Sequence, residues 1–272
     1  MENENRNYVK ENPLLIQRLA INHSRTILGS FVIGLLVIYI FSAVIPNLLE
    51  YFYPQSYWDY IINKQNIELS DEYIKKLPQI TIVGMLYTFV FSGVVEIGRA
   101  LYTLTFIRAR KADISSFFEG FQLFFKALCI AAAKSLIISF GLMLLIIPGV
   151  MSFYSFRQAY FILADNPKKG AMQCLAESRY MMTGNKMNLF RLDLSYLSLI
   201  LVAYMPVLIL SIFGLVNIEK LSGLILLIVA NIPMTIAQGW LTVGQGIFYE
   251  LQLTGSFANF KYAGEEAFRA GL

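Results

Sequence analysis

The sequence predicts an all-α fold, a polytopic membrane bundle of about six transmembrane helices with amphipathic interfacial helices, and three observations predict it. The 272 residues are 57% hydrophobic and only 15% charged, whereas an average soluble domain is about 25% charged. The mean hydropathy is +0.57, and several apolar runs approach the ~20 residues that a helix needs to span a bilayer. Aromatic residues are abundant, with 21 Phe and 16 Tyr, as expected where rings lie at the membrane interface.

The apolar run 127–165 is the central feature of the chain. Pro148-Gly149 breaks this run, which predicts two antiparallel helices at about 127–147 and 150–164. The second helix has 15 residues and rises about 22 Å, less than the ~30 Å of the hydrocarbon core. Two arrangements stay open for it: a helix that crosses with little tilt and ends within the interface, or a re-entrant segment.

Four further apolar runs complete the six spans, at about 27–45, 79–98, 190–215 and 223–248. Pro46 is expected to end the first of these spans, Pro206 to kink the third, and Pro233 to interrupt the fourth. The first run has full spanning length and no cleavage site after it. We therefore expect an anchor that stays in the protein rather than a removable signal.

The spans divide the chain into three parts: a cytoplasmic segment 1–26 with a short helix, one integral membrane domain 27–252 and a cytoplasmic tail 253–272. The one sizeable loop, 47–78, is polar and rich in Tyr, and it is expected on the outer side. Its aromatic residues cluster where an aromatic belt would lie.

Lys and Arg set the expected orientation, because cytoplasmic loops carry an excess of both. With six spans and both termini inside, fifteen Lys and Arg residues fall on the inner side and four on the outer side. A single crossing by 127–165 would place the basic stretch 168–191 outside. Two crossings by that central stretch therefore fit the charge distribution better.

Short surface helices are expected before three of the spans, at 12–25, 113–126 and 167–183. In the second, Asp113 is a candidate N-cap and five Phe residues follow one helical face. The five are Phe117, Phe118, Phe121, Phe124 and Phe125. This pattern favours a helix that lies in the membrane interface, and a helix packed in a core is the alternative. The third helix is expected to begin at Pro167 and to end at Gly184-Asn185, residue types suited to a left-handed C-cap.

The three surface helices suggest a weak threefold repeat, because each precedes a span, a proline near the outer side and a returning span. Ile45-Pro46, Ile147-Pro148 and Met205-Pro206 occupy similar places. Repeats in membrane proteins often surround the working site. Residue identity between the three units is poor, however, and chance is the alternative explanation.

Signatures of known enzyme chemistries are absent from the sequence: it has no phosphate-binding Gly-rich loop, no G-x-S-x-G and no H-E-x-x-H. His23 is the single histidine, which excludes a histidine metal cluster or Ser-His machinery within the chain. Cys129 and Cys174 lie far apart and suggest neither a disulfide framework nor a metal site. We therefore expect no enzymatic activity, no cofactor and no metal.

Ionisable residues within spans are the candidates for function, because each costs several kcal/mol in the bilayer unless it is paired or hydrated. Arg157, near the middle of its span, is the strongest of them. Lys134 lies close enough to the inner surface for its stem to reach that surface. Glu96 and Arg99 have the spacing of a helical ion pair, and Asp193 is expected to pair with Arg157.

The candidate polar cluster is expected near a cavity that faces the cytoplasm. It contains Arg157, Asp165, Asn166, Glu177, Arg179, Asn185, Lys186 and Asp193. The basic inner surface either sets the topology alone or also binds anionic phospholipids. The expected partners are the lipid bilayer and a membrane protein, and not nucleic acid.

Two stretches carry a family resemblance, LLIIPGVMSFYSFRQAYFILADNP and AESRYMMTGNKMNLFRLDLSYLS. They resemble the bacterial integral membrane family known as domain of unknown function 975, in the IPG turn, the ILADNP end, the S-R-x-M-M-x-G-N-K run and the L-F-x-L-D-L-S start of a span. The resemblance is specific over about 113–200. It implies a bacterial cell-membrane protein without assigned catalytic residues. A more distant similarity to the membrane region of glycerophosphodiester phosphodiesterases implies a lipid-linked role.

The absence of a chemical signature favours a non-enzymatic membrane component, such as a scaffold, a partner-binding protein or an envelope protein. The alternative is a transporter or lipid-handling protein for a small or anionic substrate that uses the polar cluster. A water-filled cavity that reaches Arg157 would favour transport, whereas a tightly packed, charge-paired interior would favour the scaffold. An intramembrane enzyme is the third hypothesis, and it requires two carboxylates that converge in a pocket.

Overall fold

The computed structural model describes residues 8–25, 28–52, 81–214 and 221–255. Over these residues the chain folds into helices without a β-sheet, which confirms the predicted all-α class. Most of the predicted loop 47–78 and of the tail 253–272 lies outside the described residues.

The described helices, in chain order, are α1 (Pro13–Arg25), α2 (Leu28–Tyr39), the π-helix η1 (Ile40–Val44), α3 (Ile45–Phe52), α6 (Ile82–Ala109), α7 (Ser115–Glu119), the 3-10 helix η2 (Gly120–Leu123), α8 (Phe124–Leu144), α9 (Ile146–Ser155), α10 (Ala159–Asp165), α11 (Ala171–Met181), α12 (Lys186–Ser195), α13 (Leu197–Ile212), α14 (Leu221–Ala230) and α15 (Ile232–Thr254).

Four helical stretches of the described chain are long and apolar enough to cross a membrane: Leu28–Phe52, Ile82–Ala109, Ser115–Leu144 and Leu221–Thr254. The pair α12 and α13 adds a fifth if the two helices, bent by 44°, count as one span. Helices of this length and composition are typical of membrane proteins. Within the described residues, the predicted span 150–164 has no counterpart of this kind.

The central stretch forms a helical hairpin, but its break lies before the predicted Pro148-Gly149. Leu145 is extended (φ −162°, ψ 151°) and ends α8, and Pro148 lies in the first turn of α9, where proline is tolerated. A Cβ on Gly141 would lie 3.0 Å from the Gly149 Cα. Glycine at both positions therefore lets the backbones of α8 and α9 approach closely.

The returning half of this hairpin is two short helices rather than one. α9 ends at Ser155, and α10 begins at Ala159 after a turn. The two helices also differ in burial, because Met151 on α9 is 52% exposed whereas Ile162 and Leu163 on α10 are fully buried. The predicted single helix 150–164 is wrong in this respect.

Prolines in the other spans act differently from the prediction. The first span does not end at Pro46 but continues to Phe52, and the π-helix η1 lies directly before the proline. Such local π adjustments accommodate proline in transmembrane helices. The bend in the third run lies at Tyr196, between α12 and α13, and Pro206 lies inside α13. Pro233, in contrast, fits the prediction, because it stands in the first turn of α15, directly after the break between α14 and α15 at Asn231.

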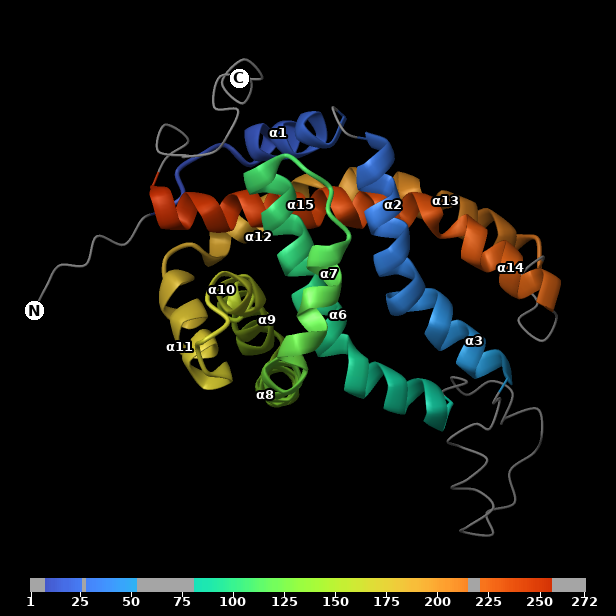
Figure 1. The fold of residues 1–272 in the computed structure, drawn as a ribbon, viewed down its shortest axis with the longest axis horizontal. Coiled ribbons are helices and arrows are strands. Elements are labelled where there is room, and N and C mark those ends of the chain that lie inside the picture. Colours follow the sequence, from blue (N-terminus) through green and yellow to red (C-terminus); the bar gives the residue numbers. More distant parts are fainter. Residues whose placement is uncertain (1–7, 26–27, 53–80, 215–220, 256–272) are drawn as a thin grey trace, which may run out of the picture.

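The predicted surface helices are packed into the bundle. α1 begins at Pro13, and the Asn12 side-chain oxygen accepts a hydrogen bond from the Leu14 backbone N–H at 2.9 Å. Its buried face includes Ile16 and Leu19, and α1 lies along α15 (Figure 1).

The five-Phe segment joins α8 through η2 instead of forming a separate interfacial helix. Phe117 is 1% exposed, and its ring centre lies 5.5 Å from that of Phe41. Phe125, in contrast, is 79% exposed. The core-packed alternative therefore holds for the start of this segment. Ile114, and not the predicted Asp113, is the N-cap of α7, although the Asp113 carboxylate accepts a hydrogen bond from the Ser115 backbone N–H at 3.1 Å.

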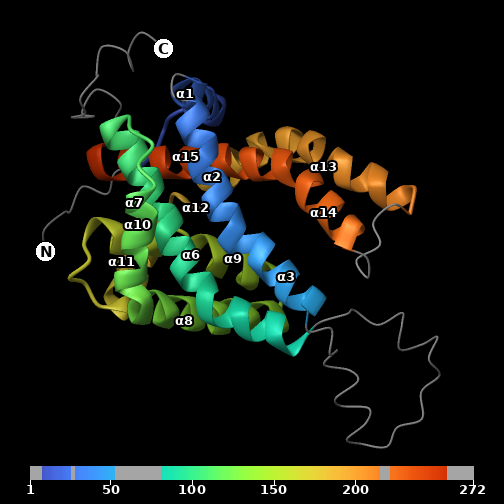
Figure 2. The ribbon, with the colours of Figure 1, turned by 45° about the vertical axis from the view of Figure 1, so that its right-hand side comes forward.

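The core lies where α6 and α15 meet α1, α10 and α12. Figure 2 shows α15 running across the molecule, with α3, α13 and α14 extending to one side. Large apolar side chains are most exposed toward the far ends of the hairpins, for example Met143 (87%), Ile147 (73%) and Ile212 (79%). The charged and polar side chains described below lie on the better-packed parts of α6, α8, α10 and α15.

Candidate functional site

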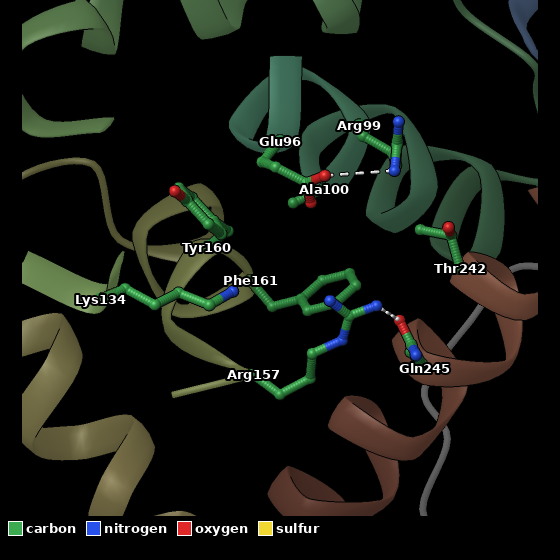
Figure 3. Close-up of a pocket in the computed structure, with 9 residues that line it drawn as sticks. All are labelled: Glu96, Arg99, Ala100, Lys134, Arg157, Tyr160, Phe161, Thr242 and Gln245. Carbon is green, nitrogen blue, oxygen red and sulfur yellow. Dashed lines mark hydrogen bonds and ion pairs between the residues drawn. The ribbon is translucent and has the colours of Figure 1, made fainter. Parts of the chain in front are cut away.

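A small hollow with a cavity volume of about 20 Å³ and an open mouth lies between α6, α8, α10 and α15. We call it the cationic hollow. It is lined by Glu96, Arg99, Ala100, Lys134, Arg157, Tyr160, Phe161, Thr242 and Gln245. Figure 3 shows Lys134 and Arg157 extending toward one central space, with Glu96 and Arg99 on the opposite wall.

α6 contributes one polar face to the cationic hollow. Glu96, Arg99 and Ala100 stand at positions i, i+3 and i+4, so a single side of the helix presents all three. A Glu96 carboxylate oxygen lies 3.2 Å from an Arg99 guanidinium nitrogen. This geometry confirms the ion pair that the spacing predicts.

Arg157 is connected to Asp193 through a third residue. Its guanidinium donates to the Gln245 side-chain oxygen at 2.8 Å, and the Gln245 amide nitrogen donates to the Asp193 carboxylate at 2.8 Å. The Tyr154 side chain also hydrogen-bonds Asp193. The predicted direct pair of Arg157 and Asp193 is therefore not formed, and Gln245 connects the two side chains instead.

Lys134 is held by aromatic rings. Its ammonium nitrogen lies 5.4 Å from the centre of the Tyr160 ring and 5.7 Å from that of Phe153, distances typical of cation–π contacts. Arg157 also lies over Phe153, at 5.3 Å. Among the described residues, Lys134 makes these ring contacts but no ion pair. Lys134 thus lines the cationic hollow, and the prediction that its stem reaches the inner surface stays a prediction.

The formal charges around the cationic hollow do not cancel. Arg99, Lys134 and Arg157 supply three positive charges and Glu96 supplies one negative charge. Asp193, behind Gln245, supplies a second negative charge. Three minus two leaves one positive charge. An arrangement of this kind is suited to binding an anion.

A second charged group lies closer to the ends of α6, α10 and α15, and we call it the inner triad. Arg108 donates to Asp165 at 2.5 Å and to Glu250 at 2.7 Å. The Glu250 side chain is only 2% exposed. The rings of Phe161 and Tyr249 stack with their centres 5.6 Å apart. Because Phe161 lines the cationic hollow and Tyr249 contacts Asp165, this ring pair lies between the two charged groups.

The structure does not gather the remaining predicted site residues into one cluster. Asn185 is 2% exposed, and its side-chain oxygen accepts a hydrogen bond from the Val9 N–H. Glu177 pairs with Lys169 at 2.6 Å. Asn166 and Arg179 are exposed and Lys186 is half-buried. Of the predicted set, Arg157 and Asp193 therefore belong with the cationic hollow and Asp165 with the inner triad.

Sequence reasoning missed Gln245, Arg108 and Glu250. Gln245 and Glu250 lie in the last long apolar run, near its inner end. Polar residues inside such runs are themselves a signal of function or pairing. The partners of these side chains, however, come from helices far away in the sequence.

Metal binding finds no support in the described residues, because no group of three or more His, Cys, Asp or Glu side chains is placed to hold an ion. Cys129 is exposed and Cys174 is buried. Burial raises the pKa of the Cys174 thiol, and the Glu177 carboxylate adds to that effect.

Comparison with curated proteins and with solved structures yields no match. Comparison with family models yields one described as Protein of unknown function (DUF975), which matches residues 142–251. The match begins at the end of α8, includes both stretches that carry the resemblance, and continues almost to the end of α15. The more distant similarity to glycerophosphodiester phosphodiesterases stays a prediction. Residues 142–251, which contain Arg157, Asp193 and Gln245, are thus similar to the DUF975 family over a little less than half of the chain.

Proposed function

We propose that this chain is a membrane protein that moves an anionic substrate, a small anion or an anionic lipid, through the cationic hollow. The observation that supports this proposal is the net positive charge of the cationic hollow. Among its three cations, Lys134 is the one that forms neither an ion pair nor a hydrogen bond with the described residues. A charge within the bilayer costs several kcal/mol unless it is paired or hydrated. A site that keeps such a charge is therefore suited to an incoming anion.

The depth of the cationic hollow also supports transport over binding at the surface. Lys126 donates to the Pro167 carbonyl, in the turn after α10, at 2.6 Å, and this contact marks the inner end of α8. Lys134 lies eight residues further along the helix, a rise of about 12 Å. Against a hydrocarbon core of ~30 Å, this depth is close to the middle of the membrane.

The proposed arrangement in the bacterial cell membrane has six crossings and both termini in the cytoplasm. α9 and α10 together form the crossing that is missing from the long apolar helices. The excess of Lys and Arg on the inner segments supports this orientation. A threefold repeat of surface helix and hairpin is part of the same proposal, and three units whose backbones do not superpose would contradict it.

A non-enzymatic scaffold or partner-binding protein is the second candidate function. The inner triad and the Glu96–Arg99 pair favour it, because charges paired within the protein need no substrate. This candidate predicts a folded protein that moves no anion and instead co-purifies with a membrane protein partner.

The test is transport by the purified full chain in vesicles of neutral lipid. One reporter is release of trapped radiolabelled inorganic phosphate, and the other is dithionite bleaching of phosphatidylglycerol that carries a fluorescent NBD label on its acyl chain. We expect the wild-type protein to accelerate at least one of the two several-fold over protein-free vesicles. Arg157→Leu should lose the acceleration, because it removes a cation from the cationic hollow.

Lys168→Gln is the matched control, since Lys168 is exposed on the turn between α10 and α11 and should leave transport unchanged. Circular dichroism and gel filtration establish that each variant is folded. Folded wild-type protein that accelerates neither reporter would contradict the transport proposal and favour the scaffold.

A further inference from the structure

The three cations of the cationic hollow differ in how firmly each is held. Arg99 forms an ion pair with Glu96, and Arg157 is hydrogen-bonded to Gln245. Lys134 contacts two rings and is close enough to Glu96 to feel its charge, but among the described residues it forms no ion pair or hydrogen bond. Its three N–H donors therefore remain for a ligand, whereas the arginines already use donors within the protein.

The net charge indicates which kind of anion fits. One positive charge is left after Glu96 and Asp193 are counted, so a monoanion balances it. A phosphate monoester carries about −1.5 to −2 at pH 7 and exceeds this charge. A phosphodiester carries a single charge and keeps it. A fatty-acid carboxylate is also a monoanion, so the test below includes it as a competitor.

The surroundings of Lys134 indicate that the anion is carried on a lipid. The residues that follow it on α8 are exposed and apolar, including Leu136 (72%) and Phe140 (65%). Phe153, which lies beside both Lys134 and Arg157, is on α9, where Val150 and Met151 are also exposed. In a membrane these surfaces face acyl chains. The wall of the cationic hollow that carries Lys134 is therefore a helix in contact with lipid.

From these observations we infer that the cationic hollow binds the phosphodiester of an anionic phospholipid, with Lys134 in contact with a non-bridging oxygen and Arg157 beside it. The acyl chains then lie along the exposed faces of α8 and α9. This inference rests on the proposed function, because it names the substrate class of the same site.

The test is equilibrium binding of acyl-NBD phosphatidylglycerol to the purified full chain in a neutral detergent. We expect saturable binding and about a tenfold or greater loss of affinity in Lys134→Gln, as for the loss of a hydrogen bond to a charged group. Lys134→Arg keeps the charge and should bind within about threefold of the wild type. Lys168→Gln should leave the affinity unchanged. Equal affinity of folded Lys134→Gln and wild type would overturn the assignment.

Competition separates the sources of the anion. Unlabelled phosphatidylglycerol should displace the probe, and phosphatidylcholine, whose choline cancels the phosphate charge, should do so more weakly. If inorganic phosphate or soluble glycerophosphoglycerol displaces the probe at equal concentration, the inference that the anion is carried on a lipid is contradicted. If oleate displaces the probe as well as phosphatidylglycerol does, the inference that the site selects a phosphodiester is contradicted.

The two proposals fail in different ways. Binding that depends on Lys134 without transport would support this inference and contradict the proposed transport. If Lys134→Gln transports the labelled lipid as fast as the wild type does, the proposed transport is supported and the role of Lys134 in binding the lipid is contradicted.

Discussion

At the scale of single residues, Arg108 shows how this protein tolerates buried charge. Its guanidinium contacts two carboxylates, and one of them, on Glu250, is almost without access to solvent. Removal of one partner from such a group leaves a buried charge without compensation, which costs more than the group contributes as a whole. The inner triad is therefore expected to be sensitive to single substitutions and more tolerant of paired ones.

We expect Arg108→Met to lower the free energy of unfolding by about 3–5 kcal/mol. Combining it with Glu250→Gln should restore part of this loss, because the orphaned charge is then removed. The measurement is unfolding in mixed detergent micelles. Arg191→Ala is the control, since Arg191 is exposed and its loss should change stability by about 0.5 kcal/mol or less. Strict additivity of the Arg108 and Glu250 effects would show that the two side chains are not coupled.

His23 connects stability to pH. It is buried on α1, with a ring nitrogen 3.1 Å from the Phe106 carbonyl oxygen. Burial lowers the pKa of His23 below its usual 6.5, the hydrogen bond to Phe106 partly opposes this, and the positive charge of Arg110 adds to the lowering. The folded protein therefore takes up the proton less readily than the unfolded chain does.

The sign of the effect follows from this difference. As the pH falls below 6.5, the unfolded chain binds a proton first, so stability declines, by at most about 1.4 kcal/mol per pH unit for one group. Above 6.5 this contribution is constant. We expect the thermal midpoint measured from pH 8 to pH 5 to show this decline in the wild type and less of it in His23→Gln. Identical profiles would assign the acid sensitivity to other groups.

Residue types in the sequence predicted part of the site. Arg157 and Asp193 stood out because charges are costly in apolar runs, and both lie at the cationic hollow or directly behind it. Gln245 was missed although it lies in an apolar run, because the candidates within spans were ionisable residues alone and an amide costs less there than a charge does. Lys134 was assigned to the inner surface because a long stem permits that reach, whereas the rings of Phe153 and Tyr160 hold it in the cationic hollow.

At the scale of elements, the turn between α11 and α12 holds the N-terminal strap, which we define as residues 8–10. The Val9 N–H donates to the Asn185 side chain at 3.1 Å, and the Asn188 amide donates to the Val9 carbonyl at 2.8 Å. Gly184, three residues after the end of α11, is left-handed (φ +84°), as predicted for this glycine. A Cβ at this position would lie 2.4 Å from the Tyr8 ring.

We expect Gly184→Ala to loosen the N-terminal strap and to destabilise the protein by about 1–2 kcal/mol through left-handed strain. Hydrogen exchange at the backbone amides of residues 8–10 should accelerate. Gly214→Ala is the matched control, because Gly214 is also left-handed (φ +64°) but has no atoms within 4 Å of an added Cβ. Gly214→Ala should have the same left-handed backbone strain but leave hydrogen exchange at the amides of residues 8–10 unchanged. Equal exchange in both variants would exclude a steric role for Tyr8.

Helix types were more predictable than helix ends. Apolar composition located the long helices. The ends of the predicted short helix 167–183 were less accurate, because α11 runs from Ala171 to Met181 and Gly184 lies three residues beyond its end. Phe117 was interpreted wrongly, since Phe41 of a distant element lies against it, and no local pattern contains that partner. Pro46 was interpreted wrongly because the preceding turn adopts a π-helix and the span continues to Phe52.

At the scale of the whole molecule, the open question is how the central hairpin meets the membrane. α10 is buried in the core, whereas the turn between α8 and α9 is exposed and apolar, with Leu145 68% exposed. A hairpin that crosses fully brings Leu145 to the outer surface, and a re-entrant hairpin leaves it inside the bilayer. Both arrangements place Lys168, after α10, in the cytoplasm.

Cysteine labelling distinguishes these arrangements. In a chain with Cys129→Ala and Cys174→Ala, we expect Lys168→Cys to be protected from a membrane-impermeant maleimide in intact cells and to react after permeabilisation. Leu145→Cys should react from outside if the hairpin crosses, and from neither side if it is re-entrant. Lys168 suits this test because it is exposed, whereas Leu175 on the next helix is buried. Reaction of Lys168→Cys in intact cells would place the basic turn outside, and the substrate path through the cationic hollow would then run from the opposite face of the membrane.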